Sequence, residues 1–526
     1  MAALDDLALR RQARRLLAPW DRPGSPGATL GLVRDGALAL HESAGLASIE
    51  LGVPIGPETC FRVASVSKQF TCAAILLLAA DGRLSVGDSV HDHLPELPDL
   101  GARISLDQLM HNVSGLRDML ELMRLGGADL SHPCRTEDLL AAIGRQRGLN
   151  FAPGTRFRYS NTGFLLLGRI VERVSGESFG DFLARRIFAP LGMTRTRHTP
   201  SVAEVAPGLA TGYLPHQGES FLRAQHGFPL GGEGGLVSCV EDLALWDRNF
   251  DTGRIPGLAE ALAEQQPFAN GGPNLYARGL EVAQYRGLRT VDHGGLWPGY
   301  KTCFLRVPEG GMTVIAIANH GGIDAHALAH RLLDAALEGR PGFHPMPPMP
   351  RLDGLAGRWI APESGATVEF AEGPTATQHG VPFSLAPTED RRLAACRGAF
   401  PFTASLPEGD SLLIETDAGT ITRFRRAPDE ASLPEGLAGR WQCEELGTTW
   451  AIVPHEGGLA VQVRGPVASA GPWPLEGIEG DAFRIRTPGT LFQGWLDGRA
   501  ERGAGGRLAG FTVNGARASG LRFLPA

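Results

Sequence analysis

Three groups of residues in this sequence have types and spacings that suit catalysis by a serine nucleophile. The first is Ser65-Val66-Ser67-Lys68, which directly precedes a helical pattern, so that Lys68 lies one turn after Ser65 on the same helix face. A serine hydroxyl is a weak nucleophile until a base removes its proton, and a desolvated neutral amine can be that base. The alternative is a capped helix with a surface lysine.

The scarcity of lysine strengthens the first motif. Lysine occurs only at Lys68 and Lys301, and arginine supplies the rest of the 50 basic residues. Arginine keeps its proton in proteins, whereas a buried lysine can lose it and act as a base. Each lysine is therefore a candidate for chemistry that arginine cannot perform.

The second group is Tyr159-Ser160-Asn161, which also precedes a helical pattern. An ammonium group lowers the pKa of a nearby tyrosine, so Tyr159 can relay a proton between Ser65 and a leaving group, while Asn161 orients Lys68 or the substrate amide. The alternative is a buried tyrosine with a bonded hydroxyl. Whether Tyr159 or Lys68 is the general base stays open.

The third group is His293-Gly294-Gly295, preceded by a strand-like run at residues 289–292. Two glycines allow a substrate backbone to approach a strand edge closely. A single histidine is more often structural than catalytic, so this motif gains weight only from the other two.

These motifs must be positioned by a large mixed domain. Residues 28–337 alternate short apolar runs with helical stretches. Apolar spacing predicts one helix over residues 70–78, ended by Gly82, and another over residues 164–174. Clustered prolines at residues 341–350 predict a stiff linker after this domain.

Beyond the linker the chain repeats itself, because the six residues Gly354-Leu355-Ala356-Gly357-Arg358-Trp359 return at residues 436–441. Each copy opens a stretch of short alternating segments interrupted by Gly, Pro and Asp, which is typical of small antiparallel sheets or barrels. We therefore predict two similar β domains with a break near residues 427–435.

Composition excludes several other classes of protein. A length of 526 residues predicts two to four domains, and a net charge of -7, from 50 basic and 57 acidic residues, argues against a nucleic-acid partner. The longest apolar run, residues 72–80, is too short to span a bilayer, and the charged N-terminus does not resemble a signal peptide. Seven scattered cysteines form no CxxC pair or metal-ligand cluster, so we expect reduced thiols in a cytoplasmic protein.

Taken in order, the three motifs resemble those of the penicillin-recognising serine hydrolases, which include class C β-lactamases, D,D-peptidases and related esterases. The resemblance extends to residues 110–116, 189–193 and 234–238 and covers about the first 335 residues. It implies an α/β catalytic domain with an antiparallel sheet and helices. Lys301-Thr302-Cys303 lacks the glycine of the Lys-Thr-Gly motif in this superfamily, so we interpret Lys301 as structural.

Within that superfamily, the chain is similar to bacterial D-aminopeptidases, which have a catalytic domain, two antiparallel eight-stranded barrels and a His-Gly-Gly motif. The expected domains are residues 1–337 (catalytic), 338–352 (linker), 353–430 (first barrel) and 431–526 (second barrel). The resemblance also places the oxyanion hole at the amides of Ser65 and Leu296, beside Gly295, and suggests a homodimer.

The histidine in the third motif bears on the substrate. D,D-peptidases and β-lactamases have a lysine there, whose charge attracts the substrate carboxylate, whereas His293 is mostly neutral and does not repel a cationic α-amino group. The resemblance to D-aminopeptidases implies that the irregular, acidic residues 471–481 of the last domain reach the cleft. There Asp481 or a neighbouring backbone carbonyl, such as that of Gly480, would hold the ammonium, and Asn274 would add a polar contact. The alternative is an exposed acidic loop.

The sequence thus predicts a serine aminopeptidase that releases small N-terminal D-amino acids, such as D-alanine, from peptides, amides and esters. Ser65, Lys68, Tyr159, Asn161 and His293 form its catalytic site, and no metal or organic cofactor is needed. The alternatives are an esterase, β-lactamase or D,D-peptidase of the same fold. An alternative of another class is a non-catalytic ligand-binding or assembly protein.

Overall fold

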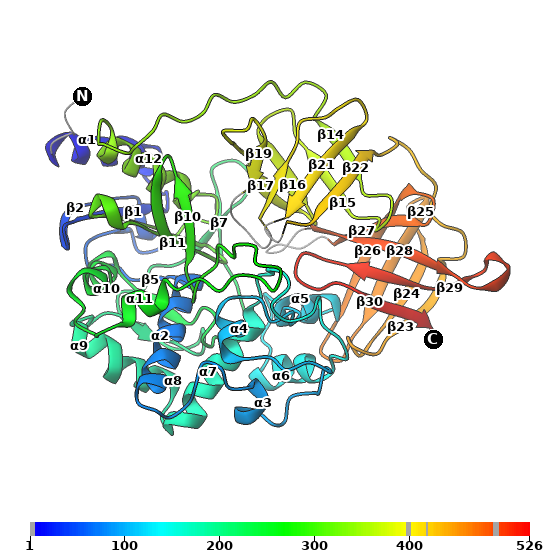
Figure 1. Ribbon diagram of the computed structural model, residues 1–526, viewed down its shortest axis with the longest axis horizontal. Coiled ribbons are helices and arrows are strands. Elements are labelled where there is room, and N and C mark those ends of the chain that lie inside the picture. The colour runs from blue at the N-terminus through cyan, green and yellow to red at the C-terminus, as the bar shows by residue number, and fades with distance from the viewer. Residues whose placement is uncertain (1–5, 396–400, 417–418, 488–493) are drawn as a thin grey trace.

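The computed structural model describes residues 6–395, 401–416, 419–487 and 494–526 (Figure 1). Its first part is organised around one antiparallel sheet of six strands in the order β10-β11-β12-β13-β1-β2. These strands are β10 (Glu281–Tyr285), β11 (Leu288–Trp297), β12 (Tyr300–Val307), β13 (Met312–Ala318), β1 (Ala28–Arg34) and β2 (Ala37–Ala44). The first long strand of this part, β1, therefore pairs with its last strand, β13.

Helices α1 (Asp6–Leu17) and α12 (Ala325–Leu337) cover one face of this sheet. Their apolar stripes, which include Leu9, Leu16, Leu332 and Leu333, pack with Val314 and other strand residues in one buried cluster. Each side chain of this kind contributes roughly 1.5–3 kcal/mol on burial. The opposite face of the sheet is thus the one that meets the helical half and the predicted catalytic motifs.

The helical half contains both predicted helices, and both predictions are confirmed. The first is α2 (Ser67–Ala80) and the second is α7 (Asn161–Ser175), which ends at Gly176 in the left-handed conformation with φ 78°. The other helices of this half are α3 (Val90–His93), α4 (Leu106–Met110), α5 (Met119–Leu125), α6 (Thr136–Gly144), α8 (Phe179–Leu183), a π-helical turn (Ala184–Phe188), α9 (Ala189–Leu191), α10 (Val240–Thr252) and α11 (Leu258–Leu262).

Short strands connect the two halves. The order β5-β9-β6 forms one small sheet, β3 pairs with β4, and β7 pairs with β8. Their bounds are β3 (Leu46–Ser48), β4 (Val53–Pro54), β5 (Phe61–Arg62), β6 (Arg197–His198), β7 (Tyr213–Pro215), β8 (Phe221–Arg223) and β9 (Leu236–Ser238).

After a stretch at residues 338–356 without helix or strand, the chain forms a nine-stranded antiparallel sheet whose end strands are β17 and β18. Only Leu385 separates these two strands in sequence, so the sheet curls into a nearly closed barrel. Its strands are β14 (Gly357–Ile360), β15 (Thr367–Phe370), β16 (Thr375–Gln378), β17 (Val381–Ser384), β18 (Ala386–Pro387), β19 (Leu393–Ala395), β20 (Phe402–Ala404), β21 (Ser411–Thr416) and β22 (Ile421–Arg426).

The last part is a closed eight-stranded antiparallel barrel. Its strands are β23 (Gly439–Cys443), β24 (Thr448–His455), β25 (Gly458–Arg464), β26 (Ser469–Glu479), β27 (Ala482–Thr487), β28 (Gly494–Arg502), β29 (Leu508–Asn514) and β30 (Leu521–Pro525). The fold class predicted from the sequence is therefore confirmed, whereas the exact domain boundaries at residues 337, 352 and 430 stay predictions.

The repeated hexapeptide performs the same structural task in both β units. In the first copy the indole Nε1 of Trp359 donates to the Leu355 carbonyl oxygen at 2.8 Å, and in the second copy Trp441 donates to Leu437 at 2.8 Å. Both indoles are buried. Each copy thus closes a turn and places a tryptophan in the apolar interior at the start of its unit.

The expectation that residues 471–481 are irregular is wrong, since most of them belong to the long strand β26. This strand pairs with β25 through Pro474 and with β27 from Leu475 onwards. Pro472 and Pro474 therefore lie where the strand has one partner, and a missing N–H is tolerated in such a place. Trp473 is buried against Trp450, which makes this segment part of the barrel core.

The last barrel packs directly on the helical half of the first part, as Figure 1 shows near α5 and α6. Both contribute to one buried apolar cluster, in which Leu125 and Ile143 come from the helices and Trp450 and Phe523 from the barrel. The Trp450 indole also donates to the Leu125 carbonyl oxygen at 3.3 Å. In the described part of the chain, no helix is long and apolar enough to cross a membrane.

Candidate active site

Ser65 lies in a short helical turn (Ala64–Val66) between β5 and the N-terminus of α2. The preceding residue, Ala64, has φ 51°, a left-handed conformation that strains a residue with a side chain. The strand-like segment before it is held by the Val63 amide, which donates to the Leu236 carbonyl oxygen at 3.1 Å. After this tight turn of the backbone, Ser65 is half-buried just before the helix, while Ala64 and Val66 on either side of it are buried.

The Lys68 amine reaches back from the first turn of α2 to Ser65. Its Nζ lies 3.1 Å from the Ser65 Oγ, 2.9 Å from the Asn161 Oδ1 and 2.5 Å from the Glu233 carbonyl oxygen. The side chain is 0% exposed, and burial lowers its pKa from 10.5 to about 7. An appreciable fraction of Lys68 is therefore neutral near pH 7.

The three contacts fix the direction of a neutral Lys68 amine. The Asn161 and Glu233 oxygens can only accept hydrogen bonds, so they take the two hydrogens of the neutral amine. The nitrogen lone pair is then left facing the Ser65 hydroxyl. This arrangement suits removal of the serine proton.

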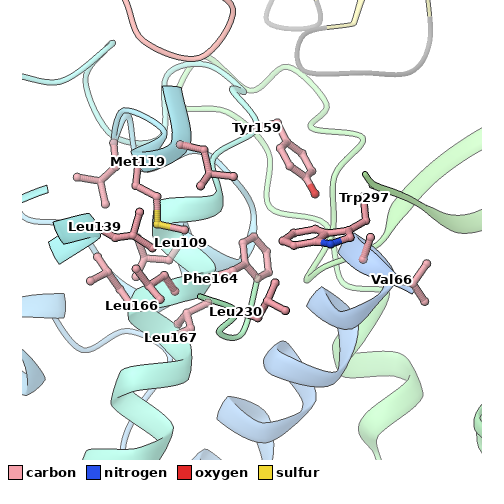
Figure 2. Packing of buried hydrophobic residues seen from close by; sticks show 14 of the residues in the cluster. Val66, Leu109, Met119, Leu139, Tyr159, Phe164, Leu166, Leu167, Leu230 and Trp297 are labelled. Carbon is pink, nitrogen blue, oxygen red and sulfur yellow. The ribbon is translucent and has the colours of Figure 1, made fainter. Parts of the chain in front are cut away.

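Tyr159 and Asn161 approach Lys68 from the N-terminus of α7. The Lys68 Nζ lies 4.9 Å from the centroid of the Tyr159 ring, and Figure 2 shows this ring and Trp297 at the margin of the apolar cluster. The backbone N–H of Asn161 donates to the Asp118 Oδ2 at 2.7 Å. Burial raises the pKa of Tyr159, although hydrogen bonding with Ser65 opposes this effect, so the phenol keeps its proton more firmly than Lys68 does.

His293 lies on β11 and is buried, with its ring centroid 6.1 Å from that of Tyr159. Its Nδ1 lies 2.6 Å from the Gly294 carbonyl oxygen, and because that oxygen only accepts, Nδ1 carries the hydrogen. The Nε2 of a neutral ring then accepts from the Tyr276 hydroxyl at 2.8 Å. The surroundings of His293 thus satisfy a neutral imidazole.

The glycines of the third motif allow β11 to approach the nucleophile. A Cβ atom on Gly295 would lie 2.3 Å from the Val63 carbonyl oxygen, two residues before Ser65, so only glycine fits there. Alternation along paired strands places His293, Gly295 and Trp297 on the face towards the helices. Lys301, which is paired with Leu296, points to the opposite face, and its interpretation as structural stays a prediction.

Four residues that the motifs did not identify also belong to this cluster: Asp118, Glu233, Tyr276 and Arg517. The buried Glu233 interrupts a glycine run at residues 231–235, and this acid among glycines was a signal available in the sequence. Burial raises the pKa of Glu233, and the charge of Lys68 opposes the rise. Asp118 and Tyr276 carried no comparable signal, because their roles depend on neighbours distant in sequence.

The predicted substrate-binding residues lie in different places. Asn274 is buried, and its side-chain amide is hydrogen-bonded within the protein. Its Nδ2 donates to the His111 carbonyl oxygen at 3.3 Å, and its Oδ1 accepts from the Tyr276 backbone amide at 3.1 Å. These two hydrogen bonds let Asn274 support the loop that positions Tyr276. Leu296, on β11, is 56% exposed.

Gly480 and Asp481 form the turn between β26 and β27, and the structure does not bring them to the cluster around Ser65. Asp481 makes an ion pair with Arg502 at 2.7 Å, and both line a surface pocket with Ser432, Leu433, Pro434 and Glu435. The expectation failed because the acidic stretch forms a barrel strand, which fixes where its terminal turn emerges. Among the described turns of this barrel, the one at residues 515–520, between β29 and β30, contacts the cluster.

Residues 11–338 match the family model described as Beta-lactamase. The chain is 30% identical over 465 residues to a D-aminopeptidase of Cereibacter sphaeroides, with 85% of each chain covered. It is 28% identical over 507 residues to a D-aminopeptidase of Brucella melitensis biotype 1, with 95% of each chain covered.

Two solved structures illustrate the structural similarity. The D-amino acid amidase from Ochrobactrum anthropi SV3, complexed with L-phenylalanine amide, is 26% identical with a TM-score of 0.54, over 63% of this chain and 99% of that chain. The octameric penicillin-binding protein homologue from Pyrococcus abyssi is 23% identical with a TM-score of 0.56, over 80% of this chain and all of that chain. The second likeness concerns the fold alone.

Proposed function

This chain belongs to the β-lactamase family and, within it, groups with D-aminopeptidases, and on that premise we propose that it is a D-stereospecific serine aminopeptidase. Its substrates are peptides, amides or esters with a free N-terminal D-amino acid, preferably a small one such as D-alanine. The observation that carries the proposal is the buried Lys68 amine, which is directed at Ser65 by two oxygens that only accept.

In the proposed reaction, the neutral Lys68 amine takes the Ser65 proton while the Ser65 Oγ attacks the substrate carbonyl carbon. The oxyanion is held by the amides of Ser65 and Leu296. The proton then passes from Lys68, with Tyr159 as relay, to the leaving nitrogen or oxygen, and an acyl-enzyme on Ser65 remains. Water hydrolyses this ester, with Lys68 as the base again.

Lys68 rather than Tyr159 is the general base in this proposal. Burial lowers the pKa of Lys68 to about 7, whereas burial raises that of Tyr159. A base is most effective when its pKa lies near the operating pH, and Lys68 meets this condition.

His293 supports the preference for an amino terminus. A neutral imidazole stands where related hydrolases place a cation, so the site does not attract a substrate carboxylate there or repel an ammonium group. Tyr276 helps to keep the imidazole neutral because its hydroxyl donates to Nε2.

The decisive assay compares hydrolysis of D-alanine amide, L-alanine amide and N-acetyl-D-alanine amide. We expect fast turnover of the first alone, since acetylation removes the charge and adds bulk. Comparable rates for the free and acetylated D-amides would contradict an aminopeptidase and favour an esterase-type enzyme, and a cephalosporin serves as the β-lactamase control.

Two further parts of the proposal concern the state of the protein in the cell: a homodimer and a cytoplasmic location. The resemblance to D-aminopeptidases supports the dimer, and the scattered cysteines support the reducing compartment. Sedimentation equilibrium of the purified chain tests the dimer, and cell fractionation tests the location.

A further inference from the structure

The turn at residues 515–520, between β29 and β30, brings the last barrel to the catalytic cluster. Figure 1 shows this red connection extending towards α5. The buried Glu121 carboxylate of α5 accepts from the Ala516 amide at 3.1 Å and from the Arg517 amide. A Cβ atom on Gly515 would lie 2.4 Å from the Glu121 Oε1, so the turn approaches the helix as closely as a glycine allows.

Further hydrogen bonds hold the same turn from other elements. The Asp118 amide and the Asn150 Nδ2 donate to the Arg517 carbonyl oxygen at 3.2 Å and 3.0 Å. Arg117 donates to the Ser519 carbonyl oxygen at 3.0 Å, and Arg158 donates to the Ser519 hydroxyl at 3.0 Å. So many bonds to one short turn fix the position of its backbone.

The Arg517 side chain extends from this fixed backbone to the catalytic tyrosine. Its guanidinium carbon lies 4.9 Å from the centroid of the Tyr159 ring, and its Nη1 lies 3.8 Å from the Asp118 Oδ2. Lys68 Nζ is also 4.9 Å from that ring centroid, so the two cationic groups are within about 10 Å of each other.

We propose that Arg517 is a positioning residue of the active site: its guanidinium group, supplied by the last barrel, holds the Tyr159 ring and keeps Lys68 in the neutral form that accepts the Ser65 proton. The inference rests on the proposed roles of Ser65 and Lys68. It gives the last barrel a part in catalysis, through a charge placed beside the base.

Several neighbouring groups shift the pKa values of Lys68 and Tyr159, and the directions of these shifts distinguish Arg517 from the other neighbours. Around Lys68, burial and then Arg517 lower the pKa, whereas Glu233, Asp118 and Cys72 raise it. Around Tyr159, hydrogen bonding with Ser65 and the charge of Arg517 oppose the effects of burial, Glu281 and Asp118. Arg517 is the cation among these neighbours that favours both a neutral Lys68 and a more acidic Tyr159.

The test measures how fast an uncharged alkyl phosphonate labels Ser65 across a range of pH. Because only neutral Lys68 accepts the proton, the labelling rate rises with pH through the pKa of Lys68. In Arg517→Gln the midpoint should move upwards by about one pH unit, the effect of one charge at the upper-bound separation of about 10 Å and an effective dielectric constant of about 20. Arg517→Lys keeps the charge and should keep the wild-type midpoint.

Arg522→Gln is the matched control, since Arg522 follows the same turn on β30 and pairs with Glu501. Its midpoint should equal that of the wild type. An unchanged midpoint in Arg517→Gln, or equal shifts in Arg517→Gln and Arg517→Lys, overturns the proposal. A purely structural role would lower the labelling rate without moving the midpoint.

If Arg517→Gln does not fold, Arg517→Met decides the question, because it keeps most of the side-chain volume, removes the charge and should also move the midpoint upwards. A wild-type midpoint in that variant overturns the proposal. The phosphonate reacts with any activated serine, so its result is independent of substrate preference. Failure of the D-aminopeptidase assignment would appear separately, in the hydrolysis of the alanine amides.

Discussion

Replacing Lys68 with arginine tests the central feature of the site, a lysine that can lose its proton. With an ordinary pKa of 10.5, about one lysine in 3,000 is neutral at pH 7. With the pKa of about 7 that burial produces, about half are neutral. Arginine stays charged throughout this range, so Lys68→Arg removes the neutral base entirely.

We therefore expect Lys68→Arg to lower kcat/KM for D-alanine amide by about 10³-fold, within the range of about 10²–10⁴ that general bases contribute. The rise of activity with pH through about 7 should also disappear, because it reports deprotonation of Lys68. The assays are amide hydrolysis and phosphonate labelling of Ser65, each measured over a range of pH.

Lys301→Arg is the matched control, because Lys301 is the other lysine and lies on the opposite face of the central sheet. It should keep wild-type activity. Since arginine is also larger than lysine, Lys68→Ala should accompany the main variant, and added methylamine should restore part of its activity. A Lys68→Arg enzyme that retained a tenth or more of wild-type turnover would refute the role of Lys68 as proton acceptor.

Three further variants test the surroundings of the base. Asn161→Asp places a carboxylate where an amide oxygen now lies 2.9 Å from Lys68, so the pH midpoint of Ser65 labelling should move up by about one unit. An unchanged midpoint would contradict the contact. Gly295→Ala should destabilise the fold by about 1–3 kcal/mol in urea unfolding, because its Cβ would lie 2.3 Å from the Val63 carbonyl oxygen; wild-type stability would show that β11 can move away. Tyr276→Phe removes the hydroxyl 2.8 Å from His293 and should lower kcat/KM for D-alanine amide about five-fold, the equivalent of one hydrogen bond of about 1 kcal/mol; unchanged kinetics would show that His293 needs no such partner.

Much of the fold followed from local patterns. Apolar spacing at period 3.6 identified the helices that became α2 and α7, and the repeated hexapeptide identified two β units. These predictions succeeded because each pattern reports which side of an element is buried, and burial dominates the stability of such elements. The prediction for residues 471–481 failed because prolines usually indicate loops, whereas here they occupy positions of β26 with a single partner strand.

The sequence by itself determined which residues form the candidate site: a serine with a lysine one turn later, a tyrosine and asparagine before a second helix, and a histidine before two glycines. Residues at such short spacings are brought together by the geometry of a single helix turn or strand, whatever the rest of the fold. Only the tertiary structure decided how the site is tuned. Burial by the fold lowers the pKa of Lys68 to about 7, so that about half of it is neutral at pH 7, and Arg517 reaches Tyr159 because a barrel turn docks on α5. The groups that meet at these points are between 93 and 358 residues apart in the sequence, so no short spacing along the chain predicts their contact.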